Sequence, residues 1–104
     1  MPSLSDTLGV GTTTLAHRVI MAPLTRCRAN KAHIHGDLAV AYYSQRASIP
    51  GTMIITEATF VSPRAGGDEH VPGIYNADQI AAWKKVTEAV HKKNSLIWCQ
   101  LWGM

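Results

Sequence analysis

The segment SLIWCQLW, residues 95–102, decides which kind of sheet this chain builds. After the opening serine, Gln100 is the single residue that interrupts an otherwise apolar run. A continuous apolar run is typical of a strand that is buried on both faces, as strands in parallel sheets are. The run therefore predicts a buried strand near residues 95–101.

Two upstream runs have the same character. RVIMAP, residues 18–23, is apolar and β-branched and ends at a proline, and GTMIITEATF, residues 51–60, has an apolar centre. They predict strands near residues 18–23 and 52–58. The G-x-G of GVGTTT precedes the first of them and is typical of a turn, so we predict an N-terminal hairpin near residues 8–16.

Amphipathic segments separate the predicted strands. DLAVAYYSQRAS predicts a helix near residues 37–48 with Asp37 as its N-cap. NADQIAAWKKVTEAVHKKN predicts a helix near residues 77–92 that Asn76 caps and that ends at a left-handed Asn94. The apolar stripe expected to face the core of this second helix consists of Ile80, Trp83, Val86 and Val90.

The elements alternate in the order strand, helix, strand, helix, strand. This order, with continuous apolar strands, indicates a parallel sheet whose faces are covered by helices. Both the doubly wound sheet and the eight-fold α/β barrel begin in this way, and three strands complete neither. The element order alone leaves the two architectures open.

The composition is that of one small globular domain. The 104 residues are 46% apolar and 16% charged, with a net charge of +3 and scattered basic residues, which argues against disorder and against a nucleic-acid partner. Cys27 and Cys99 lie far apart, which favours reduced thiols. The first residues lack a secretory pattern, and no apolar run reaches the roughly 20 residues of a membrane span. We therefore expect a cytoplasmic protein with no membrane partner.

Motifs for phosphate or metal binding are weak. A doubly wound nucleotide-binding fold needs a glycine-rich turn after its first strand, and LTRCRAN contains no glycine. His33 and His35 stand in a polar loop without further ligands at suitable spacing, so we interpret them as solvated residues. The serines suggest no Ser-His-Asp arrangement. We predict no metal site and no catalytic residue of this kind.

Polar residues nevertheless stand at the ends of the predicted strands. Thr25 follows the first strand, and Glu57 and Thr59 follow the apolar centre of the second. Gln100 lies in the third strand, with Trp102 beyond it. In an α/β barrel these strand ends line the active site. Convergence on one ligand and local capping of each strand are both compatible with the pattern.

Five stretches together resemble the old yellow enzyme family, flavin-dependent NAD(P)H oxidoreductases and ene-reductases, with fungal members closest in wording. They are RVIMAPLTRCRA, YYSQRAS, GTMIITEATFVSPRAGG, PGIYNADQIAAWKKVTEAVHKK and CQLW, in the family's order over about residues 11–102. The resemblance implies a (β/α)8 TIM barrel with FMN at the C-terminal ends of its strands. Residues 1–104 would form its N-terminal part: three parallel strands, two helices and the hairpin, as a truncated product or an incomplete gene model.

The resemblance also implies roles for individual residues. Pro23, Leu24 and Thr25 match the segment that runs along the flavin, where the threonine hydroxyl bonds the flavin O4. Ala58 matches the position whose backbone approaches the pyrimidine edge, and the Gln100 amide matches the partner of flavin N3–H and O2. Trp102 matches an aromatic residue that shapes the substrate pocket. The resemblance further implies an α,β-unsaturated carbonyl compound as substrate and NAD(P)H as hydride donor.

The family's substrate-binding pair, its proton donor and its phosphate-binding residues match nothing in this chain. We therefore assign no catalytic residue and interpret Glu57 as a buried structural carboxylate. The isolated chain is expected to be inactive. The alternatives are a catalytically dead remnant or an interaction module that docks on a full-length relative, and, less favoured, a flavodoxin-like binder.

Two structural expectations follow. Thr25, Ala58, Gln100 and Trp102 should meet at one end of the sheet. Met21, Ile55 and Ile97 should point to the inner face of the partial barrel, where the packing of further strands would be missing. We expect this uncovered surface to make the chain prone to aggregation.

Overall fold

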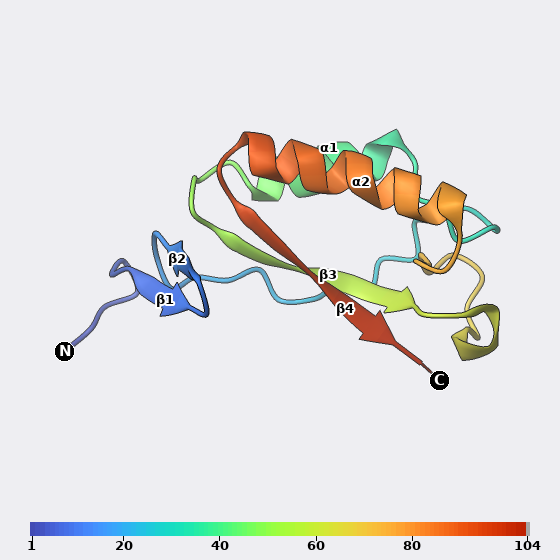
Figure 1. Cartoon of the computed structure of the whole chain (residues 1–104), viewed down its shortest axis with the longest axis horizontal. Helices are drawn as coiled ribbons and strands as arrows, with labels where there is room; N and C mark the ends of the chain where they lie inside the picture. Colours follow the sequence, from blue (N-terminus) through green and yellow to red (C-terminus); the bar gives the residue numbers. More distant parts are fainter. Residues whose placement is uncertain (104) are drawn as a thin grey trace.

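The computed structural model describes residues 1–103 and is built around a parallel strand pair with helices on one side (Figure 1). β3 (Met53–Phe60) and β4 (Leu96–Trp102) are the parallel pair, and α1 (Asp37–Arg46) and α2 (Ala77–Lys92) pack side by side over it. This arrangement confirms the parallel pairing predicted for the second and third strands. It is the α/β arrangement expected for the first part of a TIM barrel, without barrel closure.

A β-bulge interrupts the pairing of β3 with β4. Ile55 lies opposite Trp98, but the next pair joins Ala58 to Gln100, so β3 uses one residue more than β4 over this stretch. The backbone N–H of Gln100 donates to the hydroxyl of Thr56 at 3.0 Å. An extra residue re-aims the side chains that follow it. Here it leaves the Glu57 side chain toward the helices while Ala58 stays in register with Gln100.

The strand predicted near residues 18–23 is reduced to a single bridge, which corrects that prediction. Met21 pairs in parallel with Ile54: its N–H donates to the carbonyl of Met53 at 3.0 Å, and its carbonyl accepts from Ile55 N–H at 3.1 Å. The next donor in a parallel ladder would be residue 23. Pro23 has no N–H, so the ladder stops there.

Both helices lie close to their predicted ranges. α1 begins after Gly36, which is the N-cap in place of Asp37, and Asp37 instead occupies the first turn, where its charge complements the helix dipole. α2 begins as predicted, with the Asn76 side chain accepting from Gln79 N–H at 2.9 Å. Asn94 has a φ of 60°, the left-handed conformation expected after the helix.

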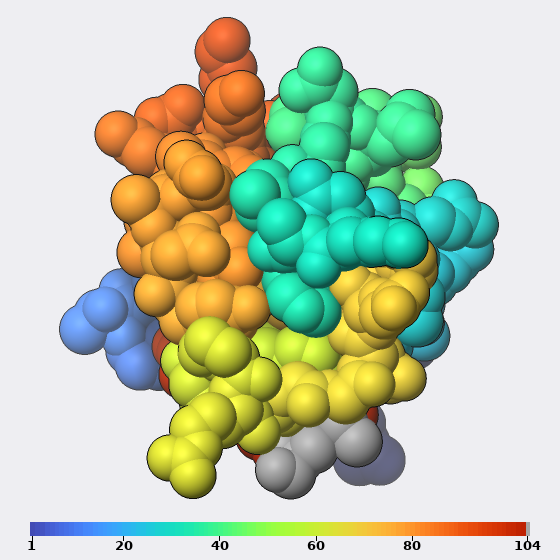
Figure 2. Space-filling view, turned by 90° about the vertical axis from the view of Figure 1, so that its right-hand side faces the viewer, coloured from blue at the N-terminus to red at the C-terminus, as the bar shows by residue number. Residues whose placement is uncertain are grey.

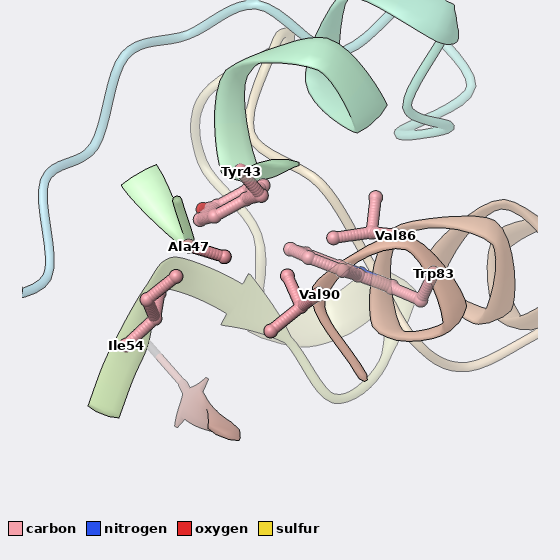
Figure 3. Packing of buried hydrophobic residues seen from close by; sticks show 6 residues of the cluster. All are labelled: Tyr43, Ala47, Ile54, Trp83, Val86 and Val90. Atoms are coloured by element: carbon pink, nitrogen blue, oxygen red, sulfur yellow. The ribbon is translucent and has the colours of Figure 1, made fainter. Parts of the chain in front are cut away.

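The hydrophobic core lies between the helices and the strand pair (Figure 3). Its six buried members come from α1 with its C-cap, from α2 and from β3: Tyr43, Ala47, Ile54, Trp83, Val86 and Val90. Met21 and Ile97 pack against this cluster, so they face the helices, and the prediction that they point inward was wrong. The reason is the strand register. Both residues pair with Ile54, and directly paired residues lie on the same face of the sheet.

One member of the predicted α2 stripe is misplaced. Ile80 is 51% exposed, whereas Gln79 is 1% exposed. The Gln79 amide donates to the carbonyl of Ala32 at 3.0 Å and accepts from the N–H of Tyr75 at 2.9 Å. A buried glutamine is needed here because backbone groups on both sides require partners.

The N-terminal hairpin is present as predicted. β1 (Leu8–Val10) and β2 (Thr13–Leu15) pair antiparallel, and Ala16 N–H bonds the carbonyl of Gly51 at 3.1 Å, just before β3. The hairpin thus lies at the N-terminal end of the strand pair (Figure 1). A short 3-10 helix, η1 (Pro63–Ala65), follows β3. Within residues 1–103, no helix has the length and apolarity that crossing a membrane requires.

Candidate functional site

The C-terminal end of the strand pair brings three of the predicted site residues together. Ala58 lies opposite Gln100, and Trp102 lies opposite Phe60 two residues further along each strand. Because side chains alternate along a strand, Gln100 and Trp102 project from the same face of β4. The parallel register of β3 and β4 thus places Ala58 next to Gln100, although 42 positions separate them in the sequence. The hypothesis that polar residues meet at the strand ends requires this proximity.

The chemistry of the Ala58–Gln100 pair suits an edge with both donors and acceptors. Ala58 is 5% exposed and offers only a methyl group, so a planar ligand meets little steric obstruction there. Gln100 is half-buried, and within residues 1–103 its side-chain amide makes no hydrogen bond. An amide carries both donor hydrogens and an acceptor oxygen. Its capacity therefore remains available to a ligand.

Trp102 is held in place from one side. Its ring stacks on Phe60 with centroids 5.7 Å apart and an interplanar angle of 9°. Phe60 is fully buried, whereas Trp102 is 37% exposed. One face of the indole is thus fixed by the core and the remainder is open as a wall for a small molecule.

The segment of residues 23–25 runs toward the C-terminal end of the strand pair, because the chain at Met21 is parallel to β3. Met21 and Ile54 are parallel partners, Thr25 comes four residues after Met21, and Ala58 comes four residues after Ile54. Thr25 and Leu24 are exposed and Pro23 is half-buried. Among the described residues, no hydrogen bond joins this segment to Ala58 or Gln100. The structure therefore pairs Ala58 with Gln100 directly and relates Thr25 to them by chain direction alone.

Figure 2 looks at the end toward which β3 and β4 run. On this surface the residues that lead into α1, in teal, and the loop between β3 and α2, in yellow-green to gold, lie next to each other, with α2, in orange, beside them. Backbone bonds fasten the two together, because Ala29 N–H donates to the carbonyl of His70 and Gly73 N–H donates to the carbonyl of His33. The end of the sheet is therefore a structured surface.

A buried polar network behind this surface was not predicted from the sequence. The Tyr43 hydroxyl donates to Oε2 of Glu57 at 2.5 Å and accepts from Glu57 N–H at 3.1 Å. Nε2 of His35 lies 3.1 Å from the same Oε2. Burial, and then the neighbouring Glu57 carboxylate, raise the pKa of Tyr43 well above its ordinary value. The network ties the loop before α1, α1 itself and β3 together.

This network confirms that Glu57 is a buried carboxylate and corrects the interpretation of the histidines. Glu57 is 4% and His35 8% exposed. His33 is half-buried, with Nδ1 at 2.6 Å from the Val71 carbonyl. Neither histidine is a solvated loop residue, because the loop folds back onto buried carbonyl and carboxylate oxygens. Across residues 1–103, no three potential metal ligands of the His, Cys, Asp or Glu type gather in one place.

In comparisons with known proteins, nearly all of this chain aligns with a part of longer proteins. Residues 4–104 match the NADH:flavin oxidoreductase / NADH oxidase family. The chain is 55% identical to the chanoclavine-I aldehyde reductase fgaOx3 of Penicillium roqueforti and 47% identical to the probable inactive dehydrogenase easA of Claviceps fusiformis. All 104 residues align with the first and 97% of the chain with the second, corresponding to 28% and 26% of those proteins.

A solved structure of an old yellow enzyme has the same fold over nearly the whole chain. Old Yellow Enzyme from Pichia sp. AKU4542 superimposes with a TM-score of 0.94 at 42% identity, over 97% of this chain and 26% of that chain. The fold of the first part of an old yellow enzyme barrel, expected from the sequence motifs, is confirmed. The chain spans about a quarter of the length of the relatives it matches. On this evidence the chain belongs to the NADH:flavin oxidoreductase / NADH oxidase family, in its old yellow enzyme branch.

Proposed function

We propose that this chain forms part of the FMN-binding surface of an NAD(P)H oxidoreductase of ene-reductase type. The observation that carries the proposal is the Ala58–Gln100 pair at the C-terminal end of the parallel strands, with the Gln100 amide lacking a partner within residues 1–103. Such strand ends are where α/β barrels bind ligands. The family match supplies the identity of the ligand class.

The residues present fit the edge of a flavin. The Gln100 amide donates to a carbonyl oxygen and accepts from a ring N–H, which is the pattern of the flavin pyrimidine edge. Ala58 leaves room for the ring because its side chain is a single methyl group. The exposed Thr25 hydroxyl would donate to the second carbonyl of the same pyrimidine ring, O4, on the other side of N3–H, and stabilise negative charge there.

The reaction expected of the complete protein is reduction of an α,β-unsaturated carbonyl compound. When bound, FMN supplies the hydride-transfer chemistry, from NAD(P)H to the β-carbon of such a compound. Trp102, fixed by Phe60, bounds the space where that substrate lies and excludes water from it. The aldehyde reductase fgaOx3 supports a carbonyl-bearing small molecule as substrate. We assign no catalytic acid within the described residues.

The test is a chimera in which this chain replaces the matching residues of the Penicillium roqueforti relative. The folded chimera should purify with FMN and oxidise NADPH in the presence of an α,β-unsaturated aldehyde. Gln100→Ala should weaken FMN binding roughly thirtyfold, because two lost hydrogen bonds cost about 1 kcal/mol each. Flavin absorbance and flavin fluorescence titration measure both effects.

Gln45→Ala is the matched control, because Gln45 is an exposed glutamine on α1, far from the strand ends in the chain. It should leave FMN binding unchanged. A folded chimera without flavin, or one in which Gln100→Ala binds FMN as tightly as the parent, would contradict the proposal.

A second candidate function is docking, without catalysis, on a full-length relative. Two large apolar side chains on β4 favour it: Trp98 is 49% and Leu101 61% exposed. The name of the Claviceps fusiformis relative, a probable inactive dehydrogenase, is compatible with it. Co-purification of the tagged chain with the Penicillium roqueforti relative, lost in Trp98→Gln/Leu101→Gln, would favour this alternative.

A further inference from the structure

A pocket of about 370 Å³ opens beside the first half of α1. Its walls include the apolar and aromatic side chains of Ala39 and Tyr42, and Glu57 of β3 also lines it. Two arginines, Arg26 and Arg28, line it from the segment before α1. Glu57 reaches it from the helix side of the strand pair, so the pocket is separate from the strand face of Gln100 and Trp102.

Glu57, which lines this pocket, has one carboxylate oxygen without a hydrogen-bond partner among residues 1–103. Tyr43 and His35 both bond to Oε2, whereas Oε1 is buried and has no hydrogen-bond partner within residues 1–103. The whole residue is 4% exposed, so bulk water does not readily satisfy that atom. A buried acceptor without a partner is unfavourable, which indicates that a donor belongs beside it.

The Tyr42 ring, which also lines the pocket, favours a flat cation. The Tyr42 ring already attracts guanidinium groups, with Cζ of Arg46 4.3 Å and Cζ of Arg26 5.9 Å from its centroid. A guanidinium is planar and weakly hydrated, stacks on aromatic rings and carries five N–H donors for a carboxylate. An ammonium group is more strongly hydrated and lacks the planar shape.

We propose that this pocket binds a guanidinium group, which donates a hydrogen bond to Oε1 of Glu57 and lies against the ring of Tyr42. Such a group has two sources. One is this chain's own Arg26 or Arg28, both exposed and both lining the pocket, on either side of a Cys27 held at a left-handed φ of 54°. The other is the guanidinium of a separate molecule.

Trp83 provides the signal for the test. Its ring lies 4.9 Å from that of His35, which bonds Glu57, so a change at Glu57 alters the surroundings of this buried indole. In a Trp98→Phe/Trp102→Phe background it is the single tryptophan, and fluorescence reads it at low protein concentration. The probe is methylguanidinium at constant ionic strength, compared with tetramethylammonium, which has equal charge and no N–H donor.

Each source gives its own result. If the source is a separate molecule, methylguanidinium changes Trp83 fluorescence saturably in the background chain, and Arg26→Gln/Arg28→Gln retains the response. If the source is internal, the background chain does not respond and Arg26→Gln/Arg28→Gln acquires a saturable response. In both cases Glu57→Gln should reduce the response at least tenfold, and Arg64→Gln, at an exposed position on η1 that does not line the pocket, should keep the pattern of its parent.

The proposal is overturned if neither the background chain nor Arg26→Gln/Arg28→Gln responds, or if Glu57→Gln responds like its parent. It is also overturned if tetramethylammonium gives the same response as methylguanidinium. This last comparison leaves Glu57 unchanged, so it decides the matter even where Glu57→Gln fails to fold by circular dichroism.

Discussion

At the scale of single residues, the buried Glu57 depends on hydrogen-bond partners from other segments. It is a carboxylate with 4% exposure, and its partners come from two segments, His35 before α1 and Tyr43 within it. A buried polar group is tolerated when it is hydrogen-bonded and becomes costly when a partner is removed. The Tyr43 hydroxyl serves Glu57 twice, as donor to Oε2 and as acceptor from the backbone N–H.

Tyr43→Phe should therefore destabilise the chain although it removes only one oxygen. The substitution removes a hydrogen bond to a buried carboxylate, and we expect the free energy of unfolding to fall by about 1–3 kcal/mol. Urea unfolding followed by circular dichroism measures the change. Tyr75→Phe, which retains Tyr43, is the control, and an unfolding free energy unchanged in Tyr43→Phe would refute the structural role of the network.

The raised pKa of Tyr43 also predicts how stability depends on pH. An unfolded tyrosine loses its proton near about pH 10, so above that pH the folded state binds more protons than the unfolded state. Stability is then lost as pH rises, by up to about 1.4 kcal/mol per pH unit for this one group. Unfolding curves from pH 8 to 11 should show this extra slope in the parent and in Tyr75→Phe, and its absence in Tyr43→Phe. Equal slopes in all three chains would show that Tyr43 is not the titrating group.

At the scale of elements, short local signals set the ends of helices and strands. Pro23 ends the Met21 bridge because it has no N–H to donate to the next position of the ladder. Asn76 starts α2 by accepting from Gln79 N–H, and Asn94 ends the turn after it with a φ of 60°. Each of these signals acts through a single backbone group.

Asn76→Ala should weaken α2 by about 1 kcal/mol, the usual cost of losing an N-cap side chain. The cap is the only side-chain acceptor that the described residues offer to Gln79 N–H, at 2.9 Å. Chemical denaturation measures the loss. Asn76→Ser, which keeps an acceptor oxygen, should recover most of it, and failure of serine to do better than alanine would show that the cap hydrogen bond contributes nothing.

At the scale of the whole molecule, β4 leaves a large apolar side chain uncovered on each of its faces: Trp98 on the face away from the core cluster, and Leu101 on the face shared with Ile97. Trp98 is 49% exposed and lies opposite the half-buried Ile55, on the face away from the core cluster. β4 also has a free edge in the described structure, since β3 is its one paired neighbour there. Open edges and uncovered apolar side chains are the usual causes of association between chains.

The purified 104-residue chain should therefore associate with itself and carry no flavin absorbance. Each apolar side chain left uncovered forgoes roughly 1.5–3 kcal/mol of burial, which a second chain can recover. Size-exclusion chromatography with light scattering should show species larger than the monomer, and Trp98→Gln/Leu101→Gln should shift them toward it. Leu4→Gln, at a 68% exposed site near the N-terminus, should change nothing. A monomer that melts sharply and holds stoichiometric flavin would be inconsistent with this expectation.

The sequence by itself determined the features that depend on local or periodic patterns. The continuous apolar runs predicted parallel β3 and β4, and the cap at Asn76 predicted the start of α2, because strand burial and helix capping leave their marks within a few neighbouring residues. The motifs predicted the family and, through it, the barrel. The roles assigned to Thr25 and Gln100 toward a flavin stay predictions.

Tertiary structure alone decided the features that depend on contacts between distant residues. The bulge in β3 sets which face Glu57 occupies, and it is created by pairing with β4. Met21 and Ile97 face the helices because both register with Ile54, and a shift of one residue would have reversed them. Gln79 is buried and Ile80 exposed because the loop at Ala32 needs an amide partner. These outcomes are set by partners far away in the chain, so no pattern of neighbouring residues carries them.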